Sequence, residues 1–433
     1  MIRRTIREWE RINYGIDDAT IPEAGADRLA AVARTSIFSG RGGEGVLEQG
    51  RKGLRARGVV GVIATTGCQL EILPKIEAVG ETNVTDATLR ARLIHMLAVA
   101  HDLPIEAGAM TQLGWQRDTV LELLIRLFCA KLTDAVRRGM PRHYLAHEDD
   151  LPTLRGRLNV ARQFSTLAVS PQKLACRFDA LSPDIVLNQV MKAAVKKLSS
   201  LAIAPDNQRS LRELSFIYTE ISDVPTSRLR WDQIVLDRSS RRWRDLLSLA
   251  RLFLNDRHQQ TSGGPIDGHA LLFEMNALFE KYVERTISWA LAGTDFSVSS
   301  QGGHRDCVYD GDTGRFRTRP DLIIRQGGRI ALIIDTKWKR MSARIDDPKQ
   351  GVSQADVYQL MAYGKLYDCS KVMLLYPHHA GLPPGPIRSH YSIAAKDAAD
   401  KLIVATLSLG GTQQSHKSAL DQLVKECLGT AYD

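Results

Sequence analysis

Cysteine is scarce in this 433-residue chain. Its six cysteines lie at positions 68, 129, 176, 307, 369 and 427, and no two of them form a C-x-x-C pair. This spacing argues against a disulfide framework and against a zinc ribbon, and it suits a reducing compartment. The sequence also lacks an apolar run of about 18 residues, so we expect no transmembrane helix and no membrane partner. No apolar segment follows the basic N-terminus, so we predict no signal peptide and a cytoplasmic location.

Motifs of two hydrolase classes are also missing. The chain has no G-x-x-x-x-G-K-[ST] pattern, so we expect no nucleotide hydrolysis through a P-loop. It has no G-x-S-x-G elbow, so nothing supports a serine hydrolase. The pair His378-His379 lacks carboxylates or cysteines at ligand spacing and makes a poor metal site.

Basic residues exceed acidic ones. Lys and Arg number 58 against 49 Asp and Glu, which gives a formal net charge of +9. An excess of this size favours a polyanionic partner. The hydrophobic share of 44% and the charged share of 25% are those of a folded protein. At roughly 150 residues per domain, the length predicts about three domains.

The apolar pattern divides the chain into three segments. Residues 1–145 are expected to form an α+β region, and residues 146–262 a mainly helical connecting region. The polar run 255–265 ends in Gly-Gly-Pro and is the boundary candidate. Residues 40–61 hold eight glycines and are expected to form an adaptable contact loop. The elements expected here are strands at 59–65 and 69–73 and helices at 87–100, 118–138, 188–201 and 243–254.

Residues 263–433 show the alternation of an α/β domain, and the fold class of the whole chain is mixed α/β. A helix separates the strands expected at 329–337 and 371–376, so we expect these two strands to run parallel. The expected elements are helix 269–292, strand 316–324, a turn at Gln326-Gly327-Gly328, strand 329–337, helix 353–367 and strand 371–376.

Charged side chains stand at the end of the strand expected at 329–337. Asp335 and Lys337 are two residues apart and therefore share a face of that strand. The preceding residues are apolar on both faces, which indicates a buried, central strand. Buried charges are costly unless they have partners or a function. Asp321 opens the neighbouring strand and can meet Asp335 across the hairpin.

These residue types suit phosphodiester chemistry. Two converging carboxylates are hard oxygen ligands for Mg²⁺ or Mn²⁺. A metal held by Asp321 and Asp335 can stabilise charge on a phosphate and lower the pKa of a bound water. Lys337 can orient or help to deprotonate that water and can offset negative charge. An isolated Asp-x-Lys on a strand is otherwise typical of a surface pair.

The same residues resemble a nuclease motif. Pro320-Asp321, followed by Asp335-Thr336-Lys337, is similar to the PD-(D/E)xK motif. Gln359 and Tyr363, four residues apart on a helix, resemble the Q-x-x-x-Y motif of RecB-like branches of that superfamily. Residues 275–283 resemble the opening helix of the fold, and this match implies that Glu280 is a third acidic metal ligand. By this resemblance the catalytic set is Asp321, Asp335, Lys337, Glu280, Gln359 and Tyr363.

The fuller set resembles the McrC family, the nuclease subunit of McrBC-type modification-dependent restriction systems. Similar segments outside the nuclease part are Ile72-Leu73-Pro74-Lys75-Ile76, Leu154-Arg155-Gly156-Arg157-Leu158 and Cys176-Arg177-Phe178-Asp179 leading to Asp184 and Asn188. The resemblance implies a PD-(D/E)xK restriction-endonuclease-like domain at 263–433 and a role in phage defence. It also implies a separate McrB-like AAA+ GTPase oligomer whose hydrolysis the chain stimulates, and modified double-stranded DNA as the substrate. Residues 1–145 would then dock on the GTPase.

Other interpretations remain open at this level. Arg319, Lys339 and Arg340 flank the motif and are candidate phosphate contacts, and the alternative is a solvated edge. The chain could be a non-catalytic adaptor of an AAA+ NTPase, or a stand-alone RecB-like repair nuclease. A solvated helix face would explain Glu280, and helix packing alone would explain Gln359 and Tyr363.

Overall fold

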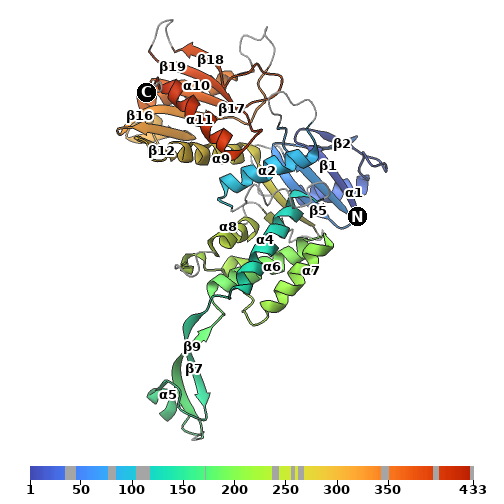
Figure 1. Cartoon of the computed structure of the whole chain (residues 1–433), viewed down its shortest axis with the longest axis vertical. Helices are drawn as coiled ribbons and strands as arrows, with labels where there is room; N and C mark the ends of the chain where they lie inside the picture. The colour runs from blue at the N-terminus through green and yellow to red at the C-terminus, as the bar shows by residue number, and fades with distance from the viewer. Residues whose placement is uncertain are drawn as a thin grey trace. The chain divides into compact units, whose positions relative to one another are not determined.

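The computed structural model describes residues 1–34, 45–76, 84–103, 118–170, 172–236, 243–254, 259–261, 268–342, 351–393 and 399–429. The chain forms two compact units (Figure 1). The first contains residues Met1–Val120 and His258–Asp433, and the second contains Leu121–Arg257. Among the described residues, no helix is long and apolar enough to cross a membrane.

A five-stranded sheet forms one part of the first unit. Every residue of its two central hairpin strands, β5 and β6, is buried, as their β-branched and apolar sequences predict. The helix α1 (Glu23–Arg34) packs its apolar residues on this sheet. The strands, in spatial order, are β1 (Ile2–Arg7), β6 (Cys68–Leu73), β5 (Val59–Thr65), β11 (Gly268–Glu274) and β10 (Gln259–Thr261).

The strand β11 corrects the sequence-based expectation of one helix over 269–292. Residues Gly268–Glu274 instead pair antiparallel with β5, and the helix α9 covers only Met275–Ala290. A short apolar run fits a buried strand as well as a buried helix, and pairing with β5 decides the outcome here. Because β11 joins the N-terminal sheet, one compact unit contains both ends of the chain. Its boundary after Arg257 falls within the predicted boundary run 255–265, and its other boundary, after Val120, differs from the predicted segment end at 145.

The glycine-rich segment 40–61 lies partly outside the described residues. Its described part forms β3 (Leu47–Gly50), β4 (Gly53–Ala56) and the start of β5, and β4 also pairs with β2 (Arg11–Asn13). Gly61 has φ +129° and packs against β11, where a Cβ atom would lie 2.0 Å from the Leu271 carbonyl oxygen. Only glycine fits this close approach.

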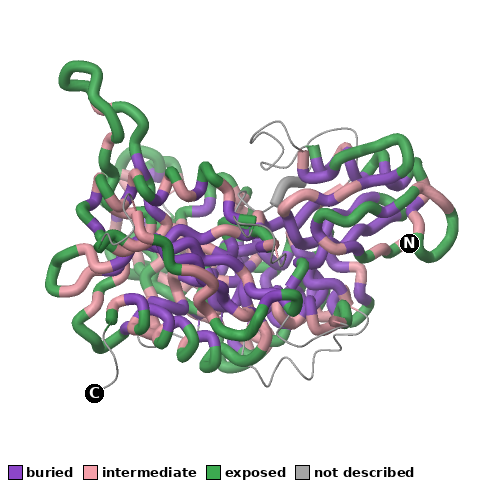
Figure 2. The backbone as a smooth tube through the Cα atoms, turned by 90° about the horizontal axis from the view of Figure 1, so that it is seen from above, coloured by how far each residue is buried: buried purple, intermediate pink, exposed green. Residues whose placement is uncertain are grey.

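A six-stranded mixed sheet forms the other part of the first unit. Its strands β16 and β17 are parallel, as predicted, and β17 is parallel to β19. The helix α10 (Gln354–Tyr367) packs on β16 and β17, and Figure 2 colours the buried residues of the chain purple. The strands, in spatial order, are β12 (Phe296–Ser300), β15 (Leu322–Gln326), β16 (Arg329–Thr336), β17 (Lys371–Pro377), β19 (Lys401–Leu407) and β18 (Ile387–Ser392).

The predicted strand 316–324 is two strands. A separate hairpin of β13 (Asp306–Asp310) and β14 (Thr313–Arg317) ends before Pro320, and β15 begins after it at Leu322. The backbone breaks between them because Pro320 has no N–H to donate and the Thr318 N–H donates to the Arg305 carbonyl oxygen. Two further helices, α2 (Asp86–Ala100) and α11 (Gln413–Leu428), pack against α9.

The second unit combines a helical bundle with a β-arm (Figure 1). The expectation that 146–262 is mainly helical is wrong for the arm, where β7 and β9 pair over nine residues. Most of β7 is exposed, and burial alternates along β9 only from Arg177 to Ser182. The bundle contains α4 (Val120–Arg137), α6 (Val186–Leu201), α7 (Pro205–Ile217) and α8 (Trp243–Leu254), with 3-10 turns at Thr226–Arg228 and Trp231–Gln233. The arm contains β7 (His143–Leu151), β8 (Arg157–Leu158), α5 (Val160–Phe164) and β9 (Leu174–Ser182).

Candidate active site

The carboxyl end of β16 carries the central pair of the predicted motif. Ile333 and Ile334 anchor the strand between β15 and β17, and Asp335 is only 1% exposed. Lys337 follows the strand, and its Nζ lies 2.7 Å from Asp335 Oδ2. The prediction of a buried, central strand is confirmed, and the ion pair at its end is a feature that the sequence analysis did not state.

Asp321 meets this strand end across the hairpin, as predicted. Leu322 pairs with Ile334, so Asp321 lies next to Asp335 in the register. Asp321 Oδ2 accepts two hydrogen bonds from Thr336, at 2.8 Å from the backbone nitrogen and 2.9 Å from Oγ1. These bonds hold the Asp321 carboxylate at the end of β16.

The helix α10 brings Gln359 and Tyr363 to the same place. Lys337 Nζ donates to Gln359 Oε1 at 3.2 Å, and Gln359 Nε2 donates to the Tyr363 hydroxyl at 2.7 Å. Burial raises the pKa of Tyr363, so its phenol stays neutral. The structure therefore connects both helix residues to Lys337 through one chain of hydrogen bonds.

Glu280 lies on α9 at the edge of this cluster. Its Oε1 accepts from Gln301 Nε2 at 2.8 Å, and Arg319 donates to Gln301 Oε1. Burial, and then the negative charge of Asp321, raise the pKa of Glu280 to about 7. Glu280 also lines a cleft of about 330 Å³ together with Gln301 and Glu284. The side chain is thus within the electrostatic field of the site and is more than a solvated helix group.

Lys337 compensates the negative charge of Asp321 and Asp335 only in part. Burial and the neighbouring Asp321 raise the pKa of Asp335 to about 6, and burial raises the pKa of Asp321. Burial lowers the pKa of Lys337, but its acidic neighbours, Asp335 first, outweigh this and raise it overall. Among the described residues, no donor meets hydrogen-bond geometry at Asp335 Oδ2, although Lys337 is close. One ammonium therefore does not fully compensate the carboxylates.

The donor set fits a divalent cation. Within the described ranges, no three His, Cys, Asp or Glu side chains come together as a complete metal-ligand set. Mg²⁺ is usually held beside phosphate substrates by one or two carboxylates, and water and phosphate oxygens complete its ligands. The adjacent, under-compensated oxygens of Asp321 and Asp335 match that share of the ligands.

Asp356 is a site residue that the sequence analysis did not identify. It is buried on α10, where its Oδ1 lies 3.8 Å from Lys337 Nζ and its Oδ2 accepts from Lys339 Nζ at 3.1 Å. The signal in the sequence is its position three residues before Gln359 and seven before Tyr363, which places all three on one helix face. The sequence analysis also missed Thr336 and Gln301, because neither belongs to a motif of ionisable residues.

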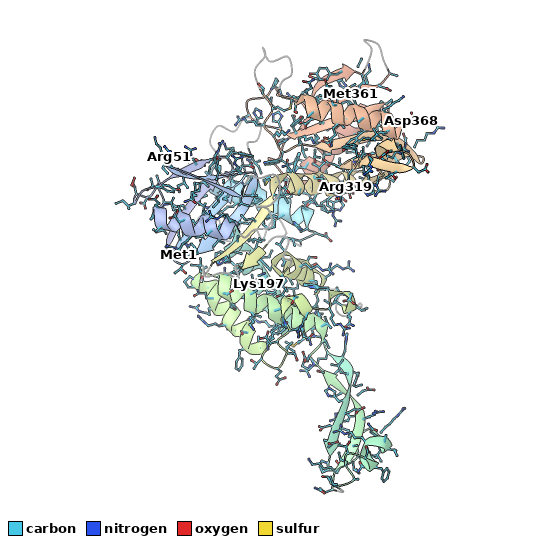
Figure 3. All side chains as sticks on the ribbon, turned by 180° about the vertical axis from the view of Figure 1, so that it is seen from behind. Met1, Arg51, Lys197, Arg319, Met361 and Asp368 are labelled. Atoms are coloured by element: carbon cyan, nitrogen blue, oxygen red, sulfur yellow. The ribbon has the colours of Figure 1, made fainter. Side chains whose placement is uncertain are left out.

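The three predicted DNA contacts lie near the site. Arg319 is at the surface (Figure 3) and contacts the site through Gln301. Lys339 and Arg340 are exposed and follow Lys337, and both line a cleft described below. Their role in DNA binding stays a prediction.

Residues 54–377 match the model of the McrBC family, described as the McrBC 5-methylcytosine restriction system component. A curated relative, the type IV methyl-directed restriction enzyme EcoKMcrBC of Escherichia coli strain K12, is 23% identical over 265 residues. That alignment covers 56% of this chain and 72% of the relative.

Two solved structures show the same fold. One is the refined half-complex from the tetradecameric assembly of Thermococcus gammatolerans McrB AAA+ hexamers with bound McrC. A chain in it matches 97% of this chain and 100% of its own length, with a TM-score of 0.70 and 19% identity. A chain in the cryo-EM structure of the Thermococcus gammatolerans McrBC complex has a TM-score of 0.53 and 24% identity, over 67% of this chain and 88% of its own. Because the family match extends over most of the sequence, the chain belongs to the McrBC restriction-component family.

Proposed function

We propose that the chain is the metal-dependent DNA endonuclease subunit of a McrBC-like restriction system. The observation that carries this proposal is that Asp321, Asp335 and Lys337 come together where β15 begins beside the end of β16. A vestigial site in a non-catalytic adaptor has no reason to keep the buried Asp335, the half-buried Asp321 and an ammonium together, because charges removed from water destabilise a fold.

Each of these residues would have a separate role in phosphodiester hydrolysis. Asp321 and Asp335 would hold Mg²⁺, or Mn²⁺ in its place, and Glu280 is a further acidic group beside them. A bound ion supplies Lewis-acid stabilisation of the phosphate and lowers the pKa of a coordinated water. Lys337 carries its proton at neutral pH, so its ammonium can orient the attacking water and offset the charge that develops on the phosphate.

Gln359 and Tyr363 would act on Lys337 rather than on the substrate. The Gln359 carbonyl oxygen fixes one hydrogen of the ammonium, and the Tyr363 hydroxyl accepts a hydrogen bond from the Gln359 amide. With its amide held in this orientation, Gln359 presents oxygen and not nitrogen to the lysine. Lys337 is thereby kept pointing toward Asp335.

We further propose an AAA+ GTPase as the partner. The similar Thermococcus gammatolerans chain comes from an assembly of McrB AAA+ hexamers with bound McrC. Residues 1–145 were expected to dock on such a partner, and they end within the first strand of the β-arm. The arm exposes large apolar side chains, among them Tyr144, Leu154 and Phe164. Exposed large apolar side chains on one small subdomain are candidate anchors for a protein partner.

The test is cleavage of modified duplex DNA by the chain assembled with its GTPase, in Mg²⁺ or Mn²⁺. Asp335→Ala should abolish cleavage with little loss of stability, since it removes a ligand and not a packing group. Asp368→Asn is the matched control, because Asp368 is exposed at the end of α10 and its left-handed backbone suits asparagine. Full cleavage by Asp335→Ala would exclude the proposed site. Nucleotide-independent cutting without the partner would favour a stand-alone repair nuclease.

A further inference from the structure

A second cleft lies beside the candidate active site. It has a volume of about 270 Å³, close to the lower limit of small-ligand pockets, about 300 Å³. Its lining includes Trp9, Lys75, Trp338, Lys339, Arg340 and His378. The cleft therefore combines segments from both ends of the chain within the first compact unit. Lys339 connects it to the candidate site, because Lys339 donates to Asp356, which lies 3.8 Å from Lys337.

Trp9 is held in an unfavourable conformation at this cleft. Its φ is +64°, a value that non-glycine residues rarely adopt, and its side chain is nevertheless 42% exposed. The strain is maintained from both sides, since Glu8 N–H donates to Leu73 and Trp9 N–H donates to Ala56. Backbone strain of this kind persists mainly where function requires it.

Arg55 orients the indole of Trp9. Its Nε donates to the Trp9 carbonyl oxygen at 3.2 Å, and its guanidinium lies 6.0 Å from the ring centroid. A fixed, partly exposed indole next to cationic groups is the arrangement on which proteins stack unpaired nucleic-acid bases.

The floor of the cleft is rigid. Glu8 is 1% exposed, and its carboxylate accepts from Trp338 Nε1 at 2.8 and 3.0 Å and from the Lys75 backbone nitrogen at 2.9 Å. These three contacts satisfy the hydrogen-bonding needs of the Glu8 carboxylate, the acidic group among the lining residues. The ammonium of Lys75 and the guanidinium of Arg340 are exposed side chains, so the charge that the cleft presents is positive.

His378 adds a polar group without a partner to the lining. Its Nδ1 is hydrogen-bonded to the Thr406 hydroxyl at 3.0 Å, which fixes one edge of the ring. Its Nε2 is buried and has no hydrogen-bond partner among the residues that the structure describes. Buried polar atoms are rarely left without a partner, so this nitrogen on a residue of the lining points to a ligand that hydrogen-bonds to it.

We propose that this cleft binds one nucleotide of an unpaired DNA strand, next to the strand position that is cut. The base would stack on Trp9 and form a hydrogen bond with His378 Nε2, and the phosphate would contact Lys75 and Arg340. The inference rests on the proposed function, because it assigns the flanking strand of the same substrate.

The experiment measures binding and not cleavage, so that the two proposals fail separately. The full-length chain, in a chelating buffer, is titrated into a fluorescently labelled short deoxycytidine oligonucleotide and into the same oligonucleotide with central abasic residues. Trp9→Gly removes the indole and tolerates the positive φ, and Trp9→Phe retains a stacking ring. Lys75→Ala is compared with Lys52→Ala, an equal change of charge on the exposed turn between β3 and β4.

Stacking on Trp9 predicts that Trp9→Gly weakens binding of the deoxycytidine oligonucleotide by about tenfold, while Trp9→Phe binds almost as wild type. The abasic oligonucleotide should bind weakly to all three proteins. Lys75→Ala should weaken both oligonucleotides, and Lys52→Ala neither. Equal binding of the deoxycytidine oligonucleotide by Trp9→Gly and wild type would overturn the inference. An equal loss of affinity for both oligonucleotides in Trp9→Gly would also overturn the inference. Neither result would affect the cleavage test on Asp335.

Discussion

At the scale of single residues, the site depends on groups that position Lys337. Asp356 is the clearest of them, because its two oxygens reach Lys337 and Lys339 from a neighbouring helix. Asp356→Asn removes the charge and retains the shape. We expect cleavage to fall by about tenfold or more, as is usual for residues that support a ligand set, with the unfolding midpoint almost unchanged.

The control for Asp356 is a second carboxylate with a lysine partner. Asp421 accepts from Lys425 at 2.9 Å, and both residues belong to α11. Asp421→Asn should leave cleavage at the wild-type rate. A wild-type rate for Asp356→Asn would show that Asp335 and Gln359 are sufficient to position Lys337.

The fold requires glycine at position 61. A Cβ atom there would overlap the Leu271 carbonyl oxygen, and the φ of +129° excludes other residues. Gly61→Ala should lower the free energy of unfolding by at least about 2 kcal/mol. Gly67→Ala is the matched control, since Gly67 has φ +83° and nothing near its Cβ position, so its cost should be about 1 kcal/mol. Denaturant unfolding of both proteins measures the difference, and equal losses would contradict it.

At the scale of elements, three helices meet at a buried polar contact. The Tyr282 hydroxyl on α9 is hydrogen-bonded to His416 Nδ1 on α11 and lies 3.4 Å from His95 Nε2 on α2. Burial lowers the pKa of His95 to about 4, from its ordinary value of 6.5. The neutral imidazole is therefore part of the folded packing.

This burial predicts a pH dependence of stability. Because the folded pKa of His95 is depressed, the unfolded chain binds the extra proton first as the pH falls. The free energy of unfolding that the neutral His95 contributes is complete above pH 6.5 and is lost between pH 6.5 and 4. It amounts to no more than about 3 kcal/mol. His95→Gln should flatten the fall in unfolding free energy over that range, relative to wild type. An unchanged slope would contradict the assignment.

Local patterns in the sequence predicted the elements that carry the site. The strand β16 is apolar for its whole buried length, and the turn at 326–328 is marked by glycines, so both were predictable. Spacing on α10 placed Gln359 and Tyr363 on one face. The strand β11 was not predictable, because its apolar run becomes a strand only by pairing with β5, more than two hundred residues earlier. Trp9 and His378 share a cleft for the same reason: their proximity is created by tertiary packing alone.

At the scale of the whole molecule, the proposed cleavage chemistry and the β-arm belong to different compact units. The proposed nuclease residues lie in the first compact unit, and the β-arm lies in the second. Deleting residues 1–145 cannot test docking cleanly, because it would remove β1, β5 and β6 from the sheet that β11 completes. Point substitutions on the arm preserve the fold and are the better test.

Phe164 and Phe216 make a matched pair for that test. Phe164 is 76% exposed on α5 of the arm, and Phe216 is 83% exposed on α7 of the bundle. If the arm contacts the GTPase, Phe164→Ser should reduce stimulation of GTP hydrolysis about tenfold, the effect of losing one well-packed anchor. Phe216→Ser should stimulate as wild type. Asp335→Ala should also stimulate fully, because its loss affects only the first unit's chemistry. Stimulation that survives Phe164→Ser but not Asp335→Ala would place the contact with the GTPase on the nuclease domain.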